Sequence, residues 1–339
     1  MKLGITMPSR TTDLRRIPQY AQWADEAGLD TVWSWELAKD PISQLATSSM
    51  VTQRIGLGTG LAVASNRTAA SMANHAIDID ELSGGRMHLG LGPGLIPNAK
   101  PLTYMREYMD VIRLNWQYIA TGEAPAYDGE FHSFKQPRYE VFERRAMVRP
   151  SIPIYLGAIG PKMLEMVGAK ADGWIGSLST PAYIEERVRP LVEQGAESAG
   201  RSMNEVDMLV QRFCIVSDDE DVAFDRARKQ IGFYLLAKYS DAPAKFVGLH
   251  DEVVDLRERA RTEGAAAYAN ISDELVRTFS IVGTPDQARA QVKEWEGVVD
   301  HLVLHIPYVP PLSAEESEDS YVNAVATFSR TGRSPLQPA

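Results

Sequence analysis

The sequence predicts an α/β fold of the (β/α)8 type, a TIM barrel with a helical insertion near its C-terminal part. Short apolar runs alternate with longer amphipathic runs from the first residues onward, which is the pattern of β/α units around a parallel sheet. Glycines cluster where three of the apolar runs end. The 339 residues, 44% of them hydrophobic, can bury the core of one elaborated barrel or of two ordinary domains. The alternation favours a single domain over residues 1–339.

The predicted elements follow these runs in order. Ile17, Tyr20, Ala21 and Ala24 keep helical spacing, and Gly28 then ends the first helix. The strands are expected at 3–7, 31–33, 55–59, 87–91, 152–156, 172–176, 207–217, 280–283 and 301–305. The helices are expected at 14–27, 41–52, 68–82, 101–120, from 161 onward, 285–296 and 315–328. An Asp-Gly turn between aromatic residues predicts a small hairpin over 127–134.

The segment from about 218 to 275 interrupts this alternation. Its pattern is almost entirely helical, and no β/α unit needs a connection of that length. We therefore expect an inserted lid that decides which substrate is accepted. The alternative is that its apolar residues form an oligomer interface or a minor core; these include Ile231, Phe233, Tyr234, Leu235 and Leu236.

Composition excludes several classes of partner. A net charge of -10 and a pI near 5.2 provide no basic field for nucleic acid or for an anionic membrane. The single Cys214 rules out an internal disulfide framework and a cysteine-based zinc site. No H-E-x-x-H motif is present, so we expect no metal. The first residues do not resemble a signal peptide, and no apolar run is long enough to span a membrane. These features indicate a cytoplasmic protein.

Three glycine clusters mark the ends of predicted strands: 56–60, 90–94 and 157–162. The C-terminal strand ends of a barrel form its active-site floor, where glycine lets the backbone approach a flat ring or a phosphate. Tight turns would explain any one cluster alone, but three together favour a site. Leu61 and Leu95 occupy the place of the third glycine in G-x-G-x-x-G, which argues against a Rossmann fold.

The third cluster predicts a phosphate site. Gly160 and Pro161 come just before an apolar helix, and Lys162 follows them, so backbone N–H groups and a cation meet at a helix N-terminus. Carboxylates gather near the end of the second strand, where a charged group could be catalytic or could simply be solvated; they are Asp30, Glu36 and Asp40.

Taken together, these residues resemble the bacterial luciferase-like monooxygenase superfamily, and in particular its branch that uses the deazaflavin coenzyme F420. The most specific part is RIGLGTG (54–60) with ELSGGR (81–86) and LGLGPG (89–94). The runs LGAIGPKML (156–164) and ADGWI (171–175) resemble the F420 branch, whose members often carry a Gly-Pro-Lys step here. FMN is the alternative cofactor, because flavin-using relatives share the fold.

The resemblance implies an oxidoreductase that transfers hydride between C5 of F420 and a small organic substrate. It also implies a non-prolyl cis peptide between Gly60 and Leu61, pressed against one face of the ring. Glu36 is the candidate catalytic residue, with a role as proton donor. The expected cofactor contacts are Thr59, Gly60, Leu61, Gly92, Gly94, Gly157, Ala158, Ile159, Gly160, Pro161 and Lys162. We expect a homo-oligomer, most simply a dimer.

Two positions depart from the family pattern. Leu37 replaces a histidine that often follows the acid after strand two, and Leu95 stands where a sugar-phosphate dehydrogenase of the family has a carboxylate. Both absences argue against sugar-phosphate oxidation, while reductases of unsaturated or imine-like substrates stay open. The alternatives are an FMN-dependent monooxygenase and a cofactor-binding subunit that has lost catalysis.

Overall fold

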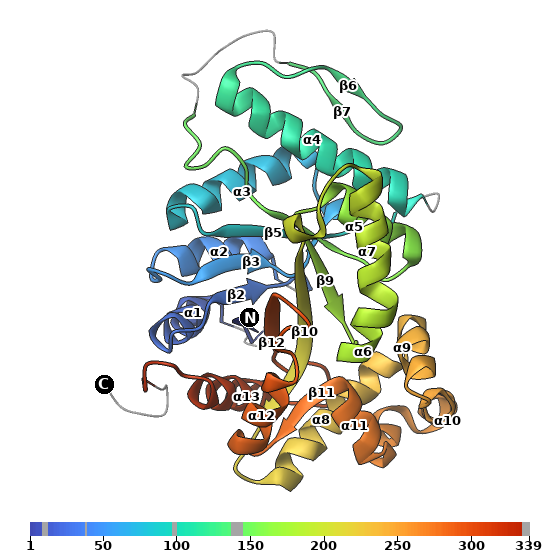
Figure 1. The fold of residues 1–339 in the computed structure, drawn as a ribbon. Coiled ribbons are helices and arrows are strands. Elements are labelled where there is room, and N and C mark those ends of the chain that lie inside the picture. The colour runs from blue at the N-terminus through green and yellow to red at the C-terminus, as the bar shows by residue number, and fades with distance from the viewer. Residues whose placement is uncertain (9–12, 38, 97–99, 137–144, 334–339) are drawn as a thin grey trace. The chain divides into compact units, whose positions relative to one another are not determined.

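The computed structural model describes residues 1–8, 13–37, 39–96, 100–136 and 145–333 (Figure 1). Its main sheet contains β1 (Lys2–Thr6), β2 (Thr31–Ser34), β3 (Gly56–Thr59), β4 (Ala62–Val63), β5 (Met87–Gly92), β8 (Ile154–Gly157), β9 (Gly173–Ser177), β10 (Asp207–Val216), β11 (Ser280–Gly283) and β12 (His301–His305). A separate hairpin contains β6 (Tyr127–Asp128) and β7 (Ser133–Phe134). All nine strands expected for the barrel are present, with ends that differ by two residues at most.

Helices connect these strands. They are α1 (Ile17–Glu26), α2 (Pro41–Ser49), α3 (Ala69–Ser83), α4 (Pro101–Thr121), α5 (Pro161–Lys170), α6 (Pro181–Tyr183), α7 (Arg189–Ser198), α8 (Glu220–Leu235), α9 (Asp241–Phe246), α10 (His250–Glu263), α11 (Asp273–Phe279), α12 (Pro285–Lys293) and α13 (Ala314–Thr327). Shorter helical turns are η1 (Leu14–Arg16), η2 (Ala64–Asn66), η4 (Ile184–Val188), η5 (Met203–Glu205), η6 (Lys238–Ser240) and η7 (Gly264–Asn270).

The sheet closes on itself. Its strands follow the order β11-β10-β12-β1-β2-β3-β5-β8-β9, and β9 also pairs with β10. Eight strands therefore form a ring, and the predicted TIM barrel is confirmed. β11 lies outside this ring: it pairs with Phe213–Val216 of β10, whereas β12 pairs with Leu209–Phe213. The long β10 thus changes partner along its length, so β12 is the eighth barrel strand and β11 is an extra one.

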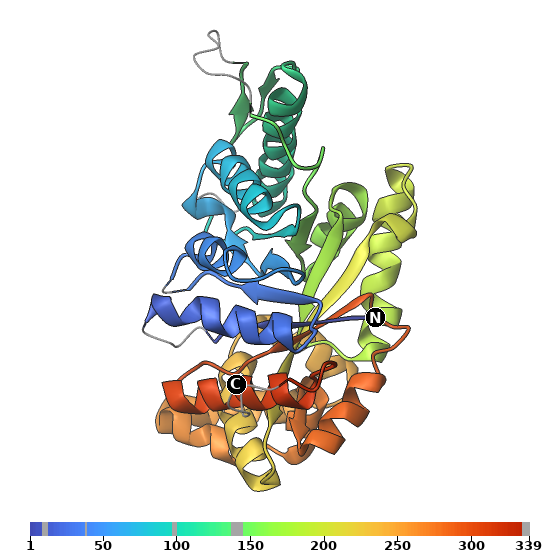
Figure 2. The same ribbon diagram turned by 90° about the vertical axis from the view of Figure 1, so that its left-hand side faces the viewer.

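Contacts divide the chain into two compact units, which we describe separately. The first unit comprises 1–32, 176–190 and 207–339, and the second comprises 33–175 and 191–206. In the first unit, β1, β10 and β12 pair in parallel. Helices α1 and α13 lie side by side in both ribbon views (Figure 2), and the Tyr321 hydroxyl donates a 2.6 Å hydrogen bond to the Tyr20 carbonyl.

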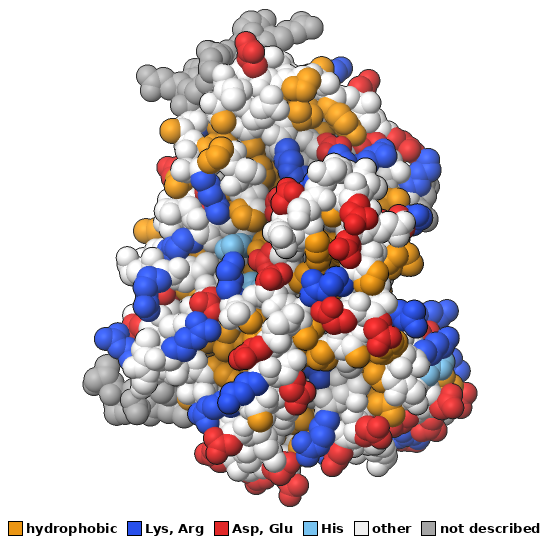
Figure 3. Space-filling model, viewed as in Figure 1, with side chains coloured by type: hydrophobic (Ala, Val, Ile, Leu, Met, Phe, Trp, Pro, Cys, Tyr) orange, Lys and Arg blue, Asp and Glu red, His pale blue; other side chains and the backbone are white. Residues whose placement is uncertain are grey.

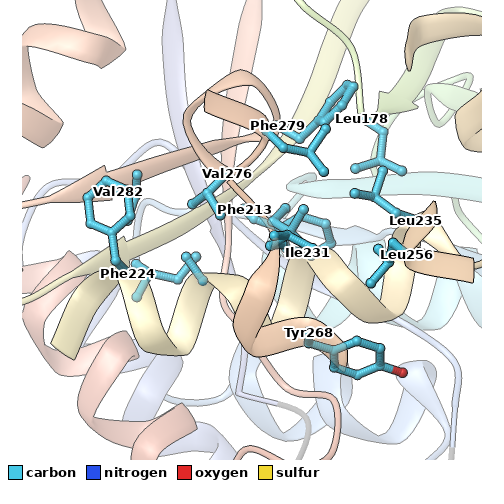
Figure 4. Close-up of a cluster of buried hydrophobic side chains, with 14 of the residues drawn as sticks. Leu178, Phe213, Phe224, Ile231, Leu235, Leu256, Tyr268, Val276, Phe279 and Val282 are labelled. Atoms are coloured by element: carbon cyan, nitrogen blue, oxygen red, sulfur yellow. The ribbon is translucent and has the colours of Figure 1, made fainter. Parts of the chain in front are cut away.

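The helices from α8 to α11 pack around a buried apolar cluster of the first unit (Figure 4). Ile231 and Leu235 of α8 pack there with Phe213 of β10 and Val282 of β11. These two residues therefore serve as core, as the alternative interpretation of the 218–275 segment expects. Phe233 is instead 44% exposed. A role for this segment in substrate choice stays a prediction.

In the second unit, the expected hairpin of β6 and β7 is confirmed and lies along α4 (Figure 1). The buried Glu107 of α4 fixes it, because its carboxylate accepts hydrogen bonds from the backbone N–H groups of Glu130, Phe131 and His132 at 3.0, 2.7 and 3.1 Å. Burial alone would raise the pKa of Glu107, but these hydrogen bonds outweigh it and lower that pKa.

Candidate functional site

The peptide bond between Gly60 and Leu61 directly follows β3, and it is cis, as predicted. The end of β2 holds this segment on both sides. The Gly60 N–H donates to the Ser34 carbonyl at 2.6 Å, and the Glu36 N–H donates to the Leu61 carbonyl at 3.0 Å. After this cis peptide, β4 pairs in parallel with β5, and Val63 lies opposite Gly92. The chain therefore leaves β3, makes a bulge and rejoins the sheet.

The Leu61 side chain contacts the ends of two other strands. A Cβ built on Gly92 would lie 2.9 Å from Leu61 Cδ1, and one built on Gly157 would lie 2.5 Å from the same atom. Gly92 ends β5 and Gly157 ends β8, and these strands are neighbours in the sheet. Leu61 fills the space beside both glycines, so a side chain at either position would have to displace it. The structure thus brings three of the predicted cofactor residues together.

Three other residues expected to contact the cofactor, Thr59, Gly94 and Ala158, hold the strand ends in place rather than offer a free polar side chain. The buried Thr59 hydroxyl donates to the Gly90 carbonyl at 2.7 Å and accepts from the Gly90 N–H at 2.9 Å, so it serves the sheet. Gly94 has φ +70°, and a Cβ there would collide with Val63 and Ser65. The buried Ala158 accepts a hydrogen bond from the Trp174 indole at 2.9 Å through its carbonyl.

The loop from Gly157 to Lys162 leads into the N-terminus of α5. Gly160 is the N-cap residue, with φ −77° and ψ 151°, and among the residues that the structure describes no side chain caps this helix. A Cβ on Gly160 would meet nothing within 4 Å. Ile159 is 55% exposed. The ammonium group of Lys162 is exposed and pairs with Glu165 at 2.8 Å. An anion at this helix end would have to compete with Glu165 for that lysine.

Glu36 lies two residues after β2 and is engaged within the protein. Its carboxylate accepts hydrogen bonds from Val63 N–H at 2.9 Å, Asn66 Nδ2 at 2.7 Å and an Arg67 guanidinium nitrogen at 2.6 Å. The side chains of Glu36 and Arg67 are only 11% and 13% exposed. The Glu36 carboxylate thus accepts three hydrogen bonds from one short segment, 63–67, which suits an anchor for that segment.

Arg67 also binds Asp40, which caps α2 by accepting from Ser43 N–H at 3.0 Å. Burial alone would raise the pKa of Asp40, but the hydrogen bonds from Ser43 and Arg67 outweigh it and hold that pKa below its usual value. Sequence reasoning missed Arg67 and Asn66. Their one signal is a polar Ser-Asn-Arg step soon after an apolar strand, which does not by itself identify Glu36 as the partner.

An aromatic group lies beside this network in the second unit. The hydroxyl groups of Tyr104 and Tyr108 donate to the carbonyls of Ala64 and Arg67 at 3.4 and 3.1 Å. The His132 ring meets the Tyr104 ring edge-on, with centroids 4.3 Å apart. Burial raises the pKa of Tyr108 and lowers that of His132, so both side chains are neutral near pH 7.

The first unit has its own polar aromatic group where β12 ends. His305 stacks on Tyr308, with ring centroids 5.6 Å apart, and the hydroxyl groups of Tyr308 and Tyr234 are hydrogen-bonded to each other. Burial lowers the pKa of His305 to about 3 and raises that of Tyr308 to about 12. Gln230 of α8 fixes the loop after the strand, because its carbonyl accepts from Tyr308 N–H at 2.8 Å.

The described residues contain neither a candidate metal centre nor a candidate membrane-spanning helix. No group of His, Cys, Asp and Glu that could hold a metal ion occurs among them. No helix in the described part of the chain is long and apolar enough to cross a membrane. The face shown in Figure 3 carries acidic and basic side chains interspersed rather than separated by sign.

Comparisons with known proteins agree with this geometry. Residues 1–302 match the model of a family described as luciferase-like monooxygenase. The chain is 33% identical over 297 residues to 5,10-methylenetetrahydromethanopterin reductase of Methanolobus tindarius, covering 82% of this chain and 86% of that protein. It is 30% identical over 312 residues to the protein of the same name from Archaeoglobus fulgidus, covering 87% and 90%.

A solved structure shares the fold. The coenzyme F420 dependent tetrahydromethanopterin reductase from Methanopyrus kandleri superposes with a TM-score of 0.80 at 23% sequence identity, and the match covers 97% of each chain. At 23% identity, the structural likeness shows a shared fold and nothing further.

Proposed function

Because the chain belongs to the luciferase-like monooxygenase family, we propose that it is a coenzyme F420-dependent oxidoreductase acting on a small organic molecule. One observation carries the proposal: Leu61 lies against Gly92 and Gly157 at neighbouring strand ends. This arrangement makes a surface of backbone and one apolar side chain, which suits the face of a flat ring. The C-terminal strand ends are also where barrel enzymes carry their sites.

The residues present fit such a cofactor. Leu61 and the glycines around it would contact the ring, and the N-terminus of α5 with Lys162 would hold its phosphate through helix-start N–H groups and charge. When bound, reduced F420 gives a hydride from C5 and a proton to the substrate, which gains two electrons while the coenzyme loses two. Glu36 and Arg67 would keep the Leu61 segment in place.

Relatives favour F420 over FMN. Two relatives that match most of the chain are named reductases of 5,10-methylenetetrahydromethanopterin, and the Methanopyrus kandleri neighbour is described as F420 dependent. By analogy, this chain would reduce a small unsaturated or imine-like molecule. An FMN monooxygenase would instead activate oxygen, which a deazaflavin does not readily do.

Calorimetric titration of the purified protein with F420 and FMN, side by side, tests the proposal. We expect micromolar binding of F420, weaker binding of FMN and no oxygen consumption with reduced FMN. Preferred binding of FMN together with oxygen consumption would show a monooxygenase. Binding of neither cofactor would favour a non-catalytic protein and overturn the proposal.

We further propose a cytoplasmic location and a homodimer. Cys214 is the single cysteine of the sequence, so no internal disulfide can form, which suits a reducing compartment. It is buried, and burial raises the pKa of its thiol and makes it a poor nucleophile. Sedimentation equilibrium of the full chain would measure the oligomeric state. A single species at the monomer mass would contradict the dimer.

A further inference from the structure

The candidate cofactor surface depends on a short stretch of chain that begins at Leu61. We call residues 61–67 the Leu61 segment; it contains β4 and η2. Glu36, which follows β2, accepts three hydrogen bonds from this segment. The Pro93 carbonyl, which follows β5, accepts a hydrogen bond from the Ser65 N–H at 3.3 Å. The two neighbours of β3 in the sheet therefore hold the segment from the barrel side.

A third support for the Leu61 segment comes from α4, outside the sheet. The Tyr108 hydroxyl donates to the Arg67 carbonyl at 3.1 Å, and the Tyr104 hydroxyl makes a longer contact of 3.4 Å with the Ala64 carbonyl. Tyr108 is fully buried, so losing the partner of its hydroxyl would be costly. Arg67 is thus held at its backbone by Tyr108 and at its side chain by Glu36.

The hairpin of β6 and β7 fixes these two tyrosines. The His132 ring packs edge-on against the rings of Tyr104 and Tyr108, with centroids 4.3 and 5.2 Å away. Glu107 holds the hairpin in this position, because its carboxylate accepts from three backbone N–H groups, including that of His132. A Cβ on Gly129 would lie 2.5 Å from the Glu107 carboxyl group, so the turn packs tightly on it. Contacts therefore run without a gap from the hairpin through α4 to the Leu61 segment.

We propose that Tyr108 is a positioning residue for the coenzyme: it holds the Arg67 end of the Leu61 segment so that Leu61 stays against the ring, and the hairpin acts through Tyr108. This inference rests on the proposed function and adds to it a residue that does not itself touch the coenzyme. Leu61 fills the space beside Gly92 and Gly157, and small displacements of such a preorganised contact weaken binding. All of these residues belong to the second unit.

Tyr108→Phe tests the proposal, because it removes the hydroxyl group and keeps the ring. The matched control is Tyr321→Phe: the Tyr321 hydroxyl is also buried and donates to a backbone carbonyl, that of Tyr20, at 2.6 Å, but it lies in the first unit. Each substitution is made in the full chain, alone and combined with Leu61→Ala. Calorimetry measures the F420 affinity, the visible absorption spectrum of bound oxidised F420 reports the ring contact, and thermal melts measure stability.

Tyr108→Phe should bind F420 about fivefold more weakly, the loss expected for one hydrogen bond, and should change the absorption spectrum of the bound coenzyme. In the Leu61→Ala background, the same substitution should weaken binding by less than about twofold, because the side chain through which it acts is gone. Tyr321→Phe should lower the melting temperature to a similar extent, but it should bind F420 with the affinity and the spectrum of the wild type.

His132→Ala tests the part played by the hairpin, and it also tests the inference if Tyr108→Phe does not fold. This substitution removes the ring that packs against both tyrosines and leaves their hydroxyl groups in place. F420 should bind about threefold more weakly, as expected for lost aromatic packing, and again only while Leu61 is present. Wild-type affinity in a folded His132→Ala would overturn the action of the hairpin through Tyr108.

Two further results would overturn the inference and leave the proposed function standing. The first is wild-type F420 affinity and spectrum in Tyr108→Phe with a lower melting temperature, since Tyr108 would then only stabilise the fold. The second is an equal loss of affinity with and without Leu61→Ala, since Tyr108 would then not act through Leu61. A wild type that does not bind F420 would instead overturn the proposed function.

Discussion

Leu61 Cδ1 lies 2.5 Å from the point where a Cβ on residue 157 would stand. Gly157→Ala must therefore move Leu61, which is possible because that atom is the far end of a flexible side chain. The fold should lose less than about 1 kcal/mol of stability. The ring contact should suffer more, because small displacements in a preorganised site are costly, and F420 should bind about tenfold more weakly.

Calorimetry with F420 and thermal melts of the same samples would measure both effects. The double variant Gly157→Ala with Leu61→Ala provides the control, because the shorter side chain leaves room for the added methyl group. If Leu61 transmits the effect, the two substitutions should be non-additive in F420 affinity. Additive losses would show that Gly157 acts independently of Leu61.

Gly160→Leu should weaken F420 binding while leaving the fold intact. The backbone there has φ −77°, and a Cβ would meet nothing within 4 Å, so the protein itself tolerates the substitution. A bulky side chain would block the helix N-terminus, and loss of a charge-assisted hydrogen bond to phosphate would cost on the order of 1–3 kcal/mol of binding free energy.

The same titration with Lys162→Met separates charge from backbone. Lys162 is exposed and paired with Glu165, so its removal should cost less than the Gly160 substitution and should matter less at high salt. If both variants bound F420 as the wild type does, α5 would not hold the phosphate.

Glu36→Gln should destabilise the protein by about 2 kcal/mol, because the amide cannot replace a carboxylate that accepts three hydrogen bonds, one of them from Arg67. F420 affinity should fall in parallel, because Glu36 holds the segment that contains Leu61. Urea unfolding and calorimetry would measure the two losses. Arg67→Met should produce a similar loss of stability.

The pH profile of kcat distinguishes this anchor from a proton donor. If Glu36 only holds the backbone, Glu36→Gln should keep the shape of the wild-type profile with a lower amplitude. The disappearance of one limb of the profile, in a variant with unchanged stability, would support the proton-donor prediction instead.

The elements and the cis bond could be predicted because their signals are local. Apolar runs bounded by glycine define strands such as β3 and β5, and the family pattern located the bulge between Gly60 and Leu61. The sequence could not show that β10 pairs with β12 along its first part and with β11 along its second, because Ser280–Gly283 and His301–His305 have the same pattern of a short buried strand. Only the register shows that the first pairs beyond the ring and the second closes it.

The site shows the same limit. Glycine clusters indicated where backbone surfaces meet a ligand, and Gly92 and Gly157 do meet at Leu61. The partner of Glu36 could not be predicted, because Arg67 is 31 residues away in sequence and only the pairing of β2 with β3 brings the two segments together. The buried Glu107 was missed for the same reason, since its three N–H donors come from a separate hairpin.

Acid should destabilise the first unit through His305. Burial lowers its folded-state pKa to about 3, whereas an unfolded histidine has an ordinary pKa near 6.5. Between these values the unfolded state binds the proton and the folded state does not, so stability falls as pH falls through this window. The stability that neutral His305 contributes is fully present above about pH 6.5 and is lost progressively toward pH 3, and the total loss is on the order of 3–5 kcal/mol.

His305→Phe keeps a ring against Phe213 and Tyr308, at centroid distances of 4.7 and 5.6 Å in the wild type, and removes the titration. Urea unfolding from pH 7.5 to 4.5 should therefore show a shallower loss of stability in His305→Phe than in the wild type. Parallel curves for the two proteins would show that His305 does not resist protonation in the folded state.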